Sequence, residues 1–307
     1  MRGTSAAKAR LVTALKGGLR PVIAYAAPSL MQFGSYLPHD YNARFYSRPV
    51  WEPVAKAADG FPVPPPEVWT YMGPSKESFL TSGREDCEAM AKAVAASDFT
   101  LEDAGRILDL ACAGGRMIRH MPSLAPGAQI WGTDINASAI LWCQDNLNPP
   151  CQFAVTTMSP HLPFEDRSFG LVYCGSLFTH FDDLAEAWFA EVHRILHPGG
   201  RLYFSINDRN AVRVFEGLAD PGSYPRYWER AGGKAEWDHF VALLRACPGY
   251  QRFRAGDAYM FTMGRSLSSH VMWDADVLCD RLAWGYRRCS VTPEAYGHQT
   301  AVLLERI

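Results

Sequence analysis

The sequence predicts an α/β fold, a doubly wound and mainly parallel seven-stranded sheet with helices on both faces. From residue 106 onward, strand-like apolar runs alternate with segments of helical periodicity, and this alternation is typical of parallel sheets. The first run, ILDL, is followed directly by the small residues ACAGG, which indicates a tight strand-to-helix turn. With 307 residues, of which 48% are hydrophobic, the chain can bury the large core that this fold needs.

The strand and helix candidates follow one another in a regular order. A helical pattern over residues 75–97 precedes the first strand, and residues 97–102 end it. Strands are expected at 106–110, 129–133, 152–156, 169–174 and 201–206, and helices near Met117, at 137–146 and at 184–196. His197-Pro198-Gly199-Gly200 ends the last of these helices, where a glycine accommodates a left-handed turn. A helix at 275–283 and strands at 286–291 and 300–305, joined through EAYGHQ, complete the sheet.

Two segments lack this alternation and divide the chain into four parts. Residues 1–74 are rich in Pro, Gly and Tyr, and we expect them to form an N-terminal arm over the main domain. Residues 75–207 form the core, residues 208–272 an inserted cap, and residues 273–307 the C-terminal helix with the last two strands. The many aromatic residues of the cap either close a substrate pocket or form a small core of the cap itself, and we favour the second interpretation.

Composition excludes several classes of partner. The net charge of −2 gives no broad basic field, so we expect no nucleic-acid partner. The eight cysteines form no CxxC pair and no Cys/His cluster at zinc-ligand spacing, so we predict no metal site and reduced thiols in a cytoplasmic protein. No apolar run reaches the 18 residues that a membrane-spanning helix requires.

The N-terminal 20 residues are basic, since five Lys and Arg side chains precede the first acidic residue, Asp40. Leu11, Val12 and Leu15 could share one helical face, and Gly17 and Gly18 would end such a helix. We favour a short helical arm packed on its own domain. Weak peripheral contact with an anionic membrane surface or a partner is the second interpretation, and an organelle transit peptide is the third.

The stretch ILDLACAGGR suits a ligand that approaches the backbone closely. In an open parallel sheet, ligands bind beyond the carboxyl ends of the strands, and small side chains in the first strand-to-helix turn admit them. Asp134 ends the next strand, 19 positions after Gly115, where its carboxylate can accept both hydroxyls of a ribose. Asp109 lies just before the turn, and a carboxylate there suits a cationic ligand better than a pyrophosphate.

Asp109, the small-residue turn and Asp134 together resemble motifs I and II of the class I S-adenosylmethionine-dependent methyltransferases, which have a Rossmann-like fold. LPFEDRSFGLVYCGSLFTHF (162–181) and EVHRILHPGGRLYFSI (191–206) resemble that family's fourth strand and its following helix and strand. SKESFLTSG (75–83) and the ending GHQTAVLLER resemble a group within it, the type 11 and 25 methyltransferases with an SxFTH segment. The resemblance covers residues 71–206 and 269–307.

The resemblance implies S-adenosylmethionine as the cofactor and a role for each motif residue. Asp109 would face the methionine amine, Asp134 would accept the ribose hydroxyls, and Ile135 would lie against the adenine. Thr157 and Met158 stand where the family often has residues that read the adenine edge. The methionine end would be lined by Ala111, Cys112, Ala113 and Gly115, and the sulfonium would lie near Gly175 and Ser176.

Two departures from the family pattern affect the cofactor site. Ala111 and Ala113 replace the first two glycines that are usual in motif I, which predicts weaker cofactor binding or a slightly displaced turn. Gly170 replaces the acidic residue that is common at the start of the fourth strand. Neither change removes an atom whose chemistry the reaction requires.

Methyl transfer is an in-line displacement, so positioning supplies most of the rate and the open question is the acceptor. We expect an oxygen of a small molecule or glycan, with His180 in SLFTH as the general base. Otherwise His180 is a histidine at a helix start, satisfied by backbone; His270 beside Trp273 and His298 beside Gln299 are the alternative bases.

Two rival functions stay open. One is a nitrogen- or protein-directed methyltransferase of the same fold. Asn148-Pro149-Pro150-Cys151 does not support a nucleic-acid version, because this sequence precedes the third strand instead of following the fourth, and we interpret it as a turn. The other rival is a non-catalytic scaffold of this fold within a biosynthetic complex.

Overall fold

The computed structural model describes residues 51–52, 55–68, 75–180, 184–217, 234–264 and 269–307. The basic segment at residues 1–20, and any contact it makes with a membrane or partner, lies outside these residues. No helix among those described is long and apolar enough to cross a membrane.

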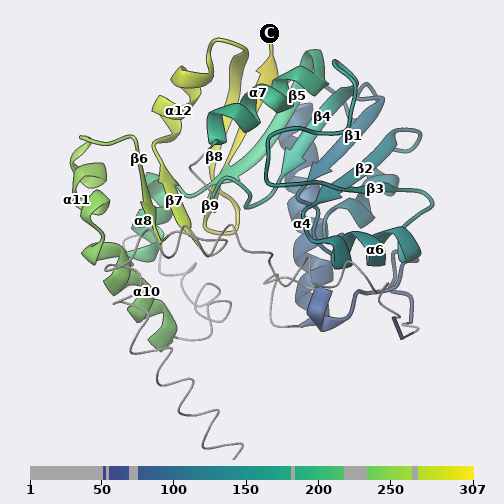
Figure 1. Cartoon of the computed structure of the whole chain (residues 1–307), viewed down its shortest axis with the longest axis horizontal. Helices are drawn as coiled ribbons and strands as arrows, with labels where there is room; N and C mark the ends of the chain where they lie inside the picture. Colours follow the sequence, from purple (N-terminus) through teal and green to yellow (C-terminus); the bar gives the residue numbers. More distant parts are fainter. Residues whose placement is uncertain (1–50, 53–54, 69–74, 181–183, 218–233, 265–268) are drawn as a thin grey trace, which may run out of the picture.

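A seven-stranded sheet forms the centre of the molecule, in the order β3-β2-β1-β4-β5-β9-β8 (Figure 1). Strands β1 to β5 are parallel, and β9 pairs antiparallel with both β5 and β8. The predicted mainly parallel sheet is therefore confirmed. The strands are β1 (Arg106–Leu110), β2 (Gln129–Asp134), β3 (Gln152–Val155), β4 (Phe169–Cys174), β5 (Leu196–Ile206), β8 (Tyr286–Tyr296) and β9 (Gln299–Arg306).

Helices cover both faces of this sheet, as a doubly wound fold requires. Because side chains alternate along a strand, Ile107 packs into one hydrophobic cluster and Leu108 into the other. The first cluster includes residues of α4 (Lys76–Ala95), α5 (Met121–Leu124) and α6 (Ala137–Asn146), and the second those of α7 (Ala185–Ile195) and α12 (Ala275–Leu282). Ser75 caps α4 by accepting a hydrogen bond from the backbone N–H of Ser78.

Two elements differ from the prediction. Near Met117 the chain forms a 3-10 turn, η2 (Ile118–His120), and the one-turn α5 in place of a longer helix. Strand β5 begins at Leu196, so the expected turn at His197–Gly200 lies inside its bounds, although Gly199 does adopt the predicted left-handed conformation with φ +80°. Gly170 in β4 is explained by packing, since a Cβ there would lie 2.4 Å from the carbonyl oxygen of Ala104.

The inserted region has its own small core. It consists of α8 (Arg209–Phe215), α10 (Lys234–Ala246), α11 (Pro248–Ala255) and the hairpin of β6 (Met260–Met263) with β7 (His270–Trp273). Phe215, Trp237, Tyr250 and Phe253 are buried in one cluster there, as the favoured interpretation of the cap aromatics predicts. Trp273 packs into the main core, so the expected boundary after residue 272 falls within β7.

Residues 55–68 lie on the main domain and are held by a buried ion pair. The Arg119 side chain is fully buried, and its Nε and Nη2 donate to the two carboxylate oxygens of Asp59 at 2.5 and 3.0 Å. Nη2 also donates to the carbonyl oxygen of Phe61 at 3.0 Å. The same segment continues into η1 (Pro66–Val68), where Val68 is buried in the core.

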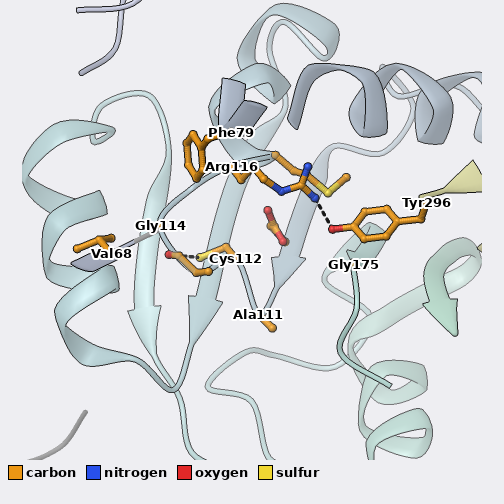
Figure 2. Close-up of a pocket in the computed structure, with 11 residues that line it drawn as sticks. Val68, Phe79, Ala111, Cys112, Gly114, Arg116, Gly175 and Tyr296 are labelled. Atoms are coloured by element: carbon orange, nitrogen blue, oxygen red, sulfur yellow. Dashed lines mark hydrogen bonds between the residues drawn. The ribbon is translucent and has the colours of Figure 1, made fainter. Parts of the chain in front are cut away.

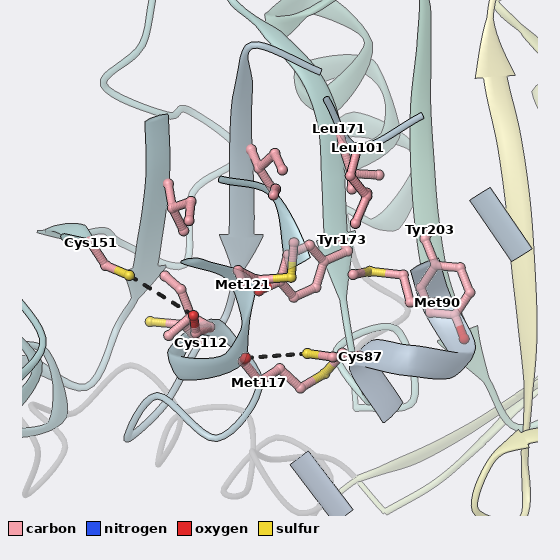
Figure 3. Packing of buried hydrophobic residues seen from close by; sticks show 14 of the residues in the cluster. Cys87, Met90, Leu101, Cys112, Met117, Met121, Cys151, Leu171, Tyr173 and Tyr203 are labelled. Atoms are coloured by element: carbon pink, nitrogen blue, oxygen red, sulfur yellow. Dashed lines mark hydrogen bonds between the residues drawn. The ribbon is translucent and has the colours of Figure 1, made fainter. Parts of the chain in front are cut away.

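The core beneath α4 is rich in sulfur (Figure 3). The Cys87 thiol donates to the carbonyl oxygen of Met117 at 3.2 Å, which ties α4 to the segment after β1. All eight cysteines are free in this structure.

Candidate active site

The order of strands places a ligand site beside β1. The chain crosses from β1 to β2 on one side and later to β4 on the other, and in open sheets of this kind ligands bind at that reversal, outside the carboxyl ends of the strands. A pocket lies at this point (Figure 2). Its lining includes five predicted residues, Asp109, Ala111, Cys112, Ala113 and Gly175.

The turn after β1 keeps a glycine-like backbone although two of its residues are alanine. Ala111 has φ +68° and Ala113 has φ +47°, both in the left-handed region where a Cβ is strained. The turn therefore keeps the backbone conformation that glycine would adopt, and its two alanines are strained there. Gly114 and Gly115 cannot be replaced by a larger residue without a clash. A Cβ would lie 2.8 Å from the carbonyl oxygen of Val68 at Gly114 and 2.5 Å from the Leu147 side chain at Gly115.

Gly115 was expected to line the methionine end of the cofactor site, but the structure places it elsewhere. It does not line the pocket, and its α-carbon faces Leu147 and Cys143 around α6, so it serves the packing of helix on turn.

Asp109 is almost fully buried at the pocket wall. Its neighbour in the register of β4 is Tyr173, so both side chains lie on the α4 face of the sheet. Burial raises the pKa of Asp109 to about 7, and the nearby Tyr173 hydroxyl and the positive charge of Arg116 offset that rise only in part. A cationic ligand would favour the charged carboxylate here.

Asp134 joins the turn to the end of β2. One carboxylate oxygen accepts from the N–H of Ala113 at 2.8 Å and the other from the N–H of Asn136 at 2.7 Å. Burial raises the pKa of Asp134, and these backbone N–H groups act in the opposite direction. The carboxylate thus fixes the turn, and Asp134 itself is not among the residues that line the pocket.

The residues expected near an adenine lie at the same end of the sheet but outside the pocket. Ile135 is half-buried after β2, whereas Thr157 and Met158 are exposed after β3. The N–H of Thr156 donates to the carbonyl oxygen of Asp134 at 2.9 Å, so the two strand ends are joined through the backbone.

The polar part of the pocket was not predicted from the sequence. Arg116, the last residue of ILDLACAGGR, and Tyr296, the last residue of β8 before the turn to β9, both line it and hydrogen-bond to each other (Figure 2). A Cβ on Gly175 would clash with the Tyr296 hydroxyl, so only glycine fits at that position. The unpredicted lining residues are Val68, Phe79, Gly114, Arg116, Met117 and Tyr296.

Gln299, from the same turn, organises the segment after β4. Its amide donates to the hydroxyl of Ser176 at 2.8 Å and accepts from the hydroxyl of Ser205 at 2.6 Å. The Ser205 hydroxyl in turn accepts from the N–H of Ser176 at 2.7 Å. Ser176 itself has φ +60°, so these bonds hold a strained residue where the resemblance expects the sulfonium.

His180 is held in one tautomer. Its Nδ1 lies 3.0 Å from the carbonyl oxygen of Ser269, and since a carbonyl only accepts, Nδ1 carries the proton in the neutral ring. The Ser269 hydroxyl also donates to the carbonyl oxygen of His180. Burial lowers the pKa of His180, so the ring is neutral near pH 7 and its Nε2 lone pair is a base.

All three candidate histidines lie along one row of rings. The His270 ring lies 6.1 Å from that of His180 and 4.9 Å from that of Phe240, and burial lowers the pKa of His270 to about 4. Phe240 lies 5.1 Å from Phe215, whose ring is 4.9 Å from that of His298. The row thus connects the loop after β4 with the inserted region and with the β8–β9 turn.

Asn148-Pro149-Pro150 forms the predicted turn. Residues 147–150 follow α6, and the N–H of Cys151 donates to the carbonyl oxygen of Leu147 at 3.0 Å, so the segment does not reach the end of β4.

Comparison with known proteins supports the assignment of this region. Residues 108–204 match the family described as a methyltransferase domain, inside the region where the resemblance was expected. The demethylmenaquinone methyltransferase of Chlorobaculum tepidum is 34% identical over 109 residues, which cover 35% of this chain and 43% of that protein. A ubiquinone/menaquinone biosynthesis C-methyltransferase of Desulfotalea psychrophila is 34% identical over 98 residues, covering 32% and 39%.

A third relative, the malonyl-[acyl-carrier protein] O-methyltransferase of Magnetococcus marinus, is 26% identical over 170 residues, which cover 50% of this chain and 63% of that protein. The chain spans about 40% of the length of the first curated relatives that it matches.

Proposed function

We propose that this chain, whose residues 108–204 form a class I S-adenosylmethionine-dependent methyltransferase domain, methylates an oxygen of a small molecule or glycan. The pocket fits the cofactor on two observations. Asp109 is a buried carboxylate whose raised pKa indicates a site for a cation, and the turn at Ala111 and Ala113 keeps the left-handed backbone that brings N–H groups close to a ligand. When bound, S-adenosylmethionine supplies a methyl carbon activated by positive sulfur.

The chain's own residues would position this cofactor and remove a proton. Asp109 would bind the methionine ammonium, Asp134 the ribose hydroxyls, and Gly175 and Ser176 would lie beside the sulfonium. His180 follows four residues after Ser176, and its Nε2 would accept the proton that a hydroxyl acceptor loses during transfer.

One observation supports oxygen as the atom that receives the methyl group: the hydrogen bond from His180 Nδ1 to the Ser269 carbonyl oxygen. It leaves Nε2 as the basic atom of a half-buried imidazole. An amine acceptor can lose its proton after transfer and needs no such base, whereas a hydroxyl acceptor gains rate from one. The relatives named above include an O-methyltransferase and a C-methyltransferase, so the acceptor atom is not assigned by similarity.

Calorimetric titration of S-adenosylhomocysteine into the full chain tests the cofactor, with Asp134→Ala as the control variant. We expect micromolar binding that the substitution abolishes. Hydroxylated acceptors, sugars first, are then screened for methyl transfer by the wild type and by His180→Ala. A transfer rate that is the same in both proteins would contradict oxygen methylation with His180 as base and would favour the nitrogen- or protein-directed alternative.

The non-catalytic scaffold remains the second candidate because Ala111 and Ala113 are strained in the turn. Binding of S-adenosylhomocysteine without turnover of S-adenosylmethionine by any class of acceptor would support it. Contact of residues 1–20 with an anionic surface is tested separately, by sedimentation with anionic vesicles at low salt.

A further inference from the structure

We infer that Arg116 and Tyr296 form a carboxylate-binding end of the cofactor pocket, so that with Asp109 the pocket selects a zwitterionic α-amino acid group. The inference rests on the proposed function and assigns two residues that neither the motif resemblance nor the matched relatives identify. All three side chains line the same pocket, and they come from the end of β1, the turn that follows it and the β8–β9 turn.

Arg116 turns away from solvent and into a polar cluster. Its side chain is 5% exposed, and its Nη1 donates to the Ser82 hydroxyl at 3.2 Å and to the Asp86 carboxylate at 2.6 Å, both on α4. Its Nη2 donates to the Tyr296 hydroxyl (Figure 2). Helix α4 approaches closely enough for this because residue 83 is glycine, where a Cβ would lie 2.2 Å from the carbonyl oxygen of Arg116.

The pair has donors left over that none of the described residues accepts. A guanidinium has five N–H groups, and the described residues accept three of them. Nε is buried and has no hydrogen-bond partner among the residues that the structure describes. The Tyr296 oxygen accepts from Arg116, which leaves its own O–H as a donor. Buried donors are nearly always satisfied, so an acceptor group of a ligand is expected beside this pair, at the Tyr296 O–H and the remaining N–H of Nη2, because Nε has almost no accessible surface.

The charges around the pocket favour an anion at this end together with a cation at the other. The carboxylate of Asp86 accepts from Nη1 of Arg116, whereas Nη2 points to Tyr296. Asp109 offers a second carboxylate within the same lining. A ligand with only an anionic group would face Asp109 unfavourably, and one with only an ammonium would leave the Arg116 and Tyr296 donors unmatched. An α-amino acid group carries both charges on one carbon and satisfies both ends.

A purely structural role is the competing explanation, since Arg116 also joins α4 to the β8–β9 turn. The two roles differ in which ligands they affect. A carboxylate contact matters only for a ligand that has the carboxylate, whereas a structural contact affects every ligand of the pocket equally.

The experiment measures dissociation constants by calorimetry for two ligands: S-adenosylhomocysteine, and S-adenosyl-3-thiopropylamine, which keeps the ammonium and lacks only the carboxylate. Tyr296→Phe preserves the ring and removes one donor, so we expect it to weaken S-adenosylhomocysteine about tenfold and to change the second ligand less than twofold. Arg116→Lys should weaken S-adenosylhomocysteine at least as much. Asp109→Asn is the matched control and should weaken both ligands.

Equal weakening of both ligands by Tyr296→Phe would overturn the inference and leave the residue a structural role. Unchanged binding of both ligands in the variant would overturn it as well. If the wild-type protein binds neither ligand, the proposed cofactor fails instead, and thermal unfolding of each variant separates that outcome from misfolding.

Discussion

The Nδ1 atom of His180 lies 3.0 Å from the carbonyl oxygen of Ser269, a residue 89 positions later in the chain. This bond fixes the imidazole tautomer through a backbone atom, which no side-chain substitution at residue 269 can remove. The orientation of the His180 ring therefore depends on the backbone position of Ser269, and in the proposed function the inserted region would act by holding this imidazole in place.

Replacing His180 by Ala should lower methyl transfer to a hydroxyl acceptor by about 10²-fold or more, the range for loss of a general base. Because burial lowers the pKa of His180 below 6.5, the wild-type rate should be constant near neutral pH and should fall as pH drops through that lowered pKa. Initial rates between pH 4.5 and 8.5 check this. His161→Ala, at an exposed histidine, is the control and should keep the wild-type profile.

Affinity for S-adenosylhomocysteine should weaken as pH falls below 7. The free protein binds a proton at Asp109 up to about pH 7, and an ammonium prefers the ionised carboxylate, so binding must expel that proton at lower pH. The dissociation constant should rise toward about tenfold per pH unit between pH 6.5 and 5. In Asp109→Asn the pH dependence should be lost along with most of the affinity; a slope that persists would assign the proton to another group.

Asp59→Ala should destabilise the fold by about 3 kcal/mol, because it leaves the buried guanidinium of Arg119 without its carboxylate. Urea unfolding followed by circular dichroism measures the change. Asp166→Ala is a suitable comparison, since the Asp166 partner of Arg194 is 73% exposed and its loss should cost less than about 1 kcal/mol. Similar losses in the two variants would mean that the segment at residues 55–68 is not held by this ion pair.

Ala111→Gly and Ala113→Gly should each stabilise the protein by up to about 1 kcal/mol, because both residues adopt a positive φ that strains an alanine. Thermal unfolding checks the sign. Ala190→Gly, at an exposed position in the interior of α7, should shift it the other way by about 1 kcal/mol. Destabilisation by either turn variant would show that the alanine methyl groups contribute packing that outweighs the backbone strain.

The sheet was predictable because each strand carries its own signal. Residues 106–110 and 169–174 were placed with correct bounds, since both runs are apolar and end in small residues. The hairpin of β6 and β7 was missed because its strands are four residues each and include His270 and Thr262, with no alternation that distinguishes them from a loop. Short strands of this kind depend on the tertiary contacts that cover them.

The polar half of the site was not predictable in the same way. Asp109 and Asp134 were predicted because both lie at strand ends close in sequence to the small-residue turn. Tyr296 and Gln299 were noted only as part of a connection, because their function depends on β9 lying beside β5 and carrying the turn to the end of β4. Only the arrangement of strands brings these side chains to Arg116 and Ser176.

The hydrogen bond between Arg116 and Tyr296 joins residues 180 positions apart, across a strand, β9, that is paired on both sides. Contacts of such long sequence separation form late in folding, because the chain must first lose the entropy of closing a large loop. A folding intermediate that has assembled β1 to β5 but has not added β8 and β9 would contain Asp109 and the turn, yet it would lack Tyr296, the pocket residue to which Arg116 hydrogen-bonds. Cofactor binding should therefore discriminate the completed sheet from its precursors and stabilise only the former.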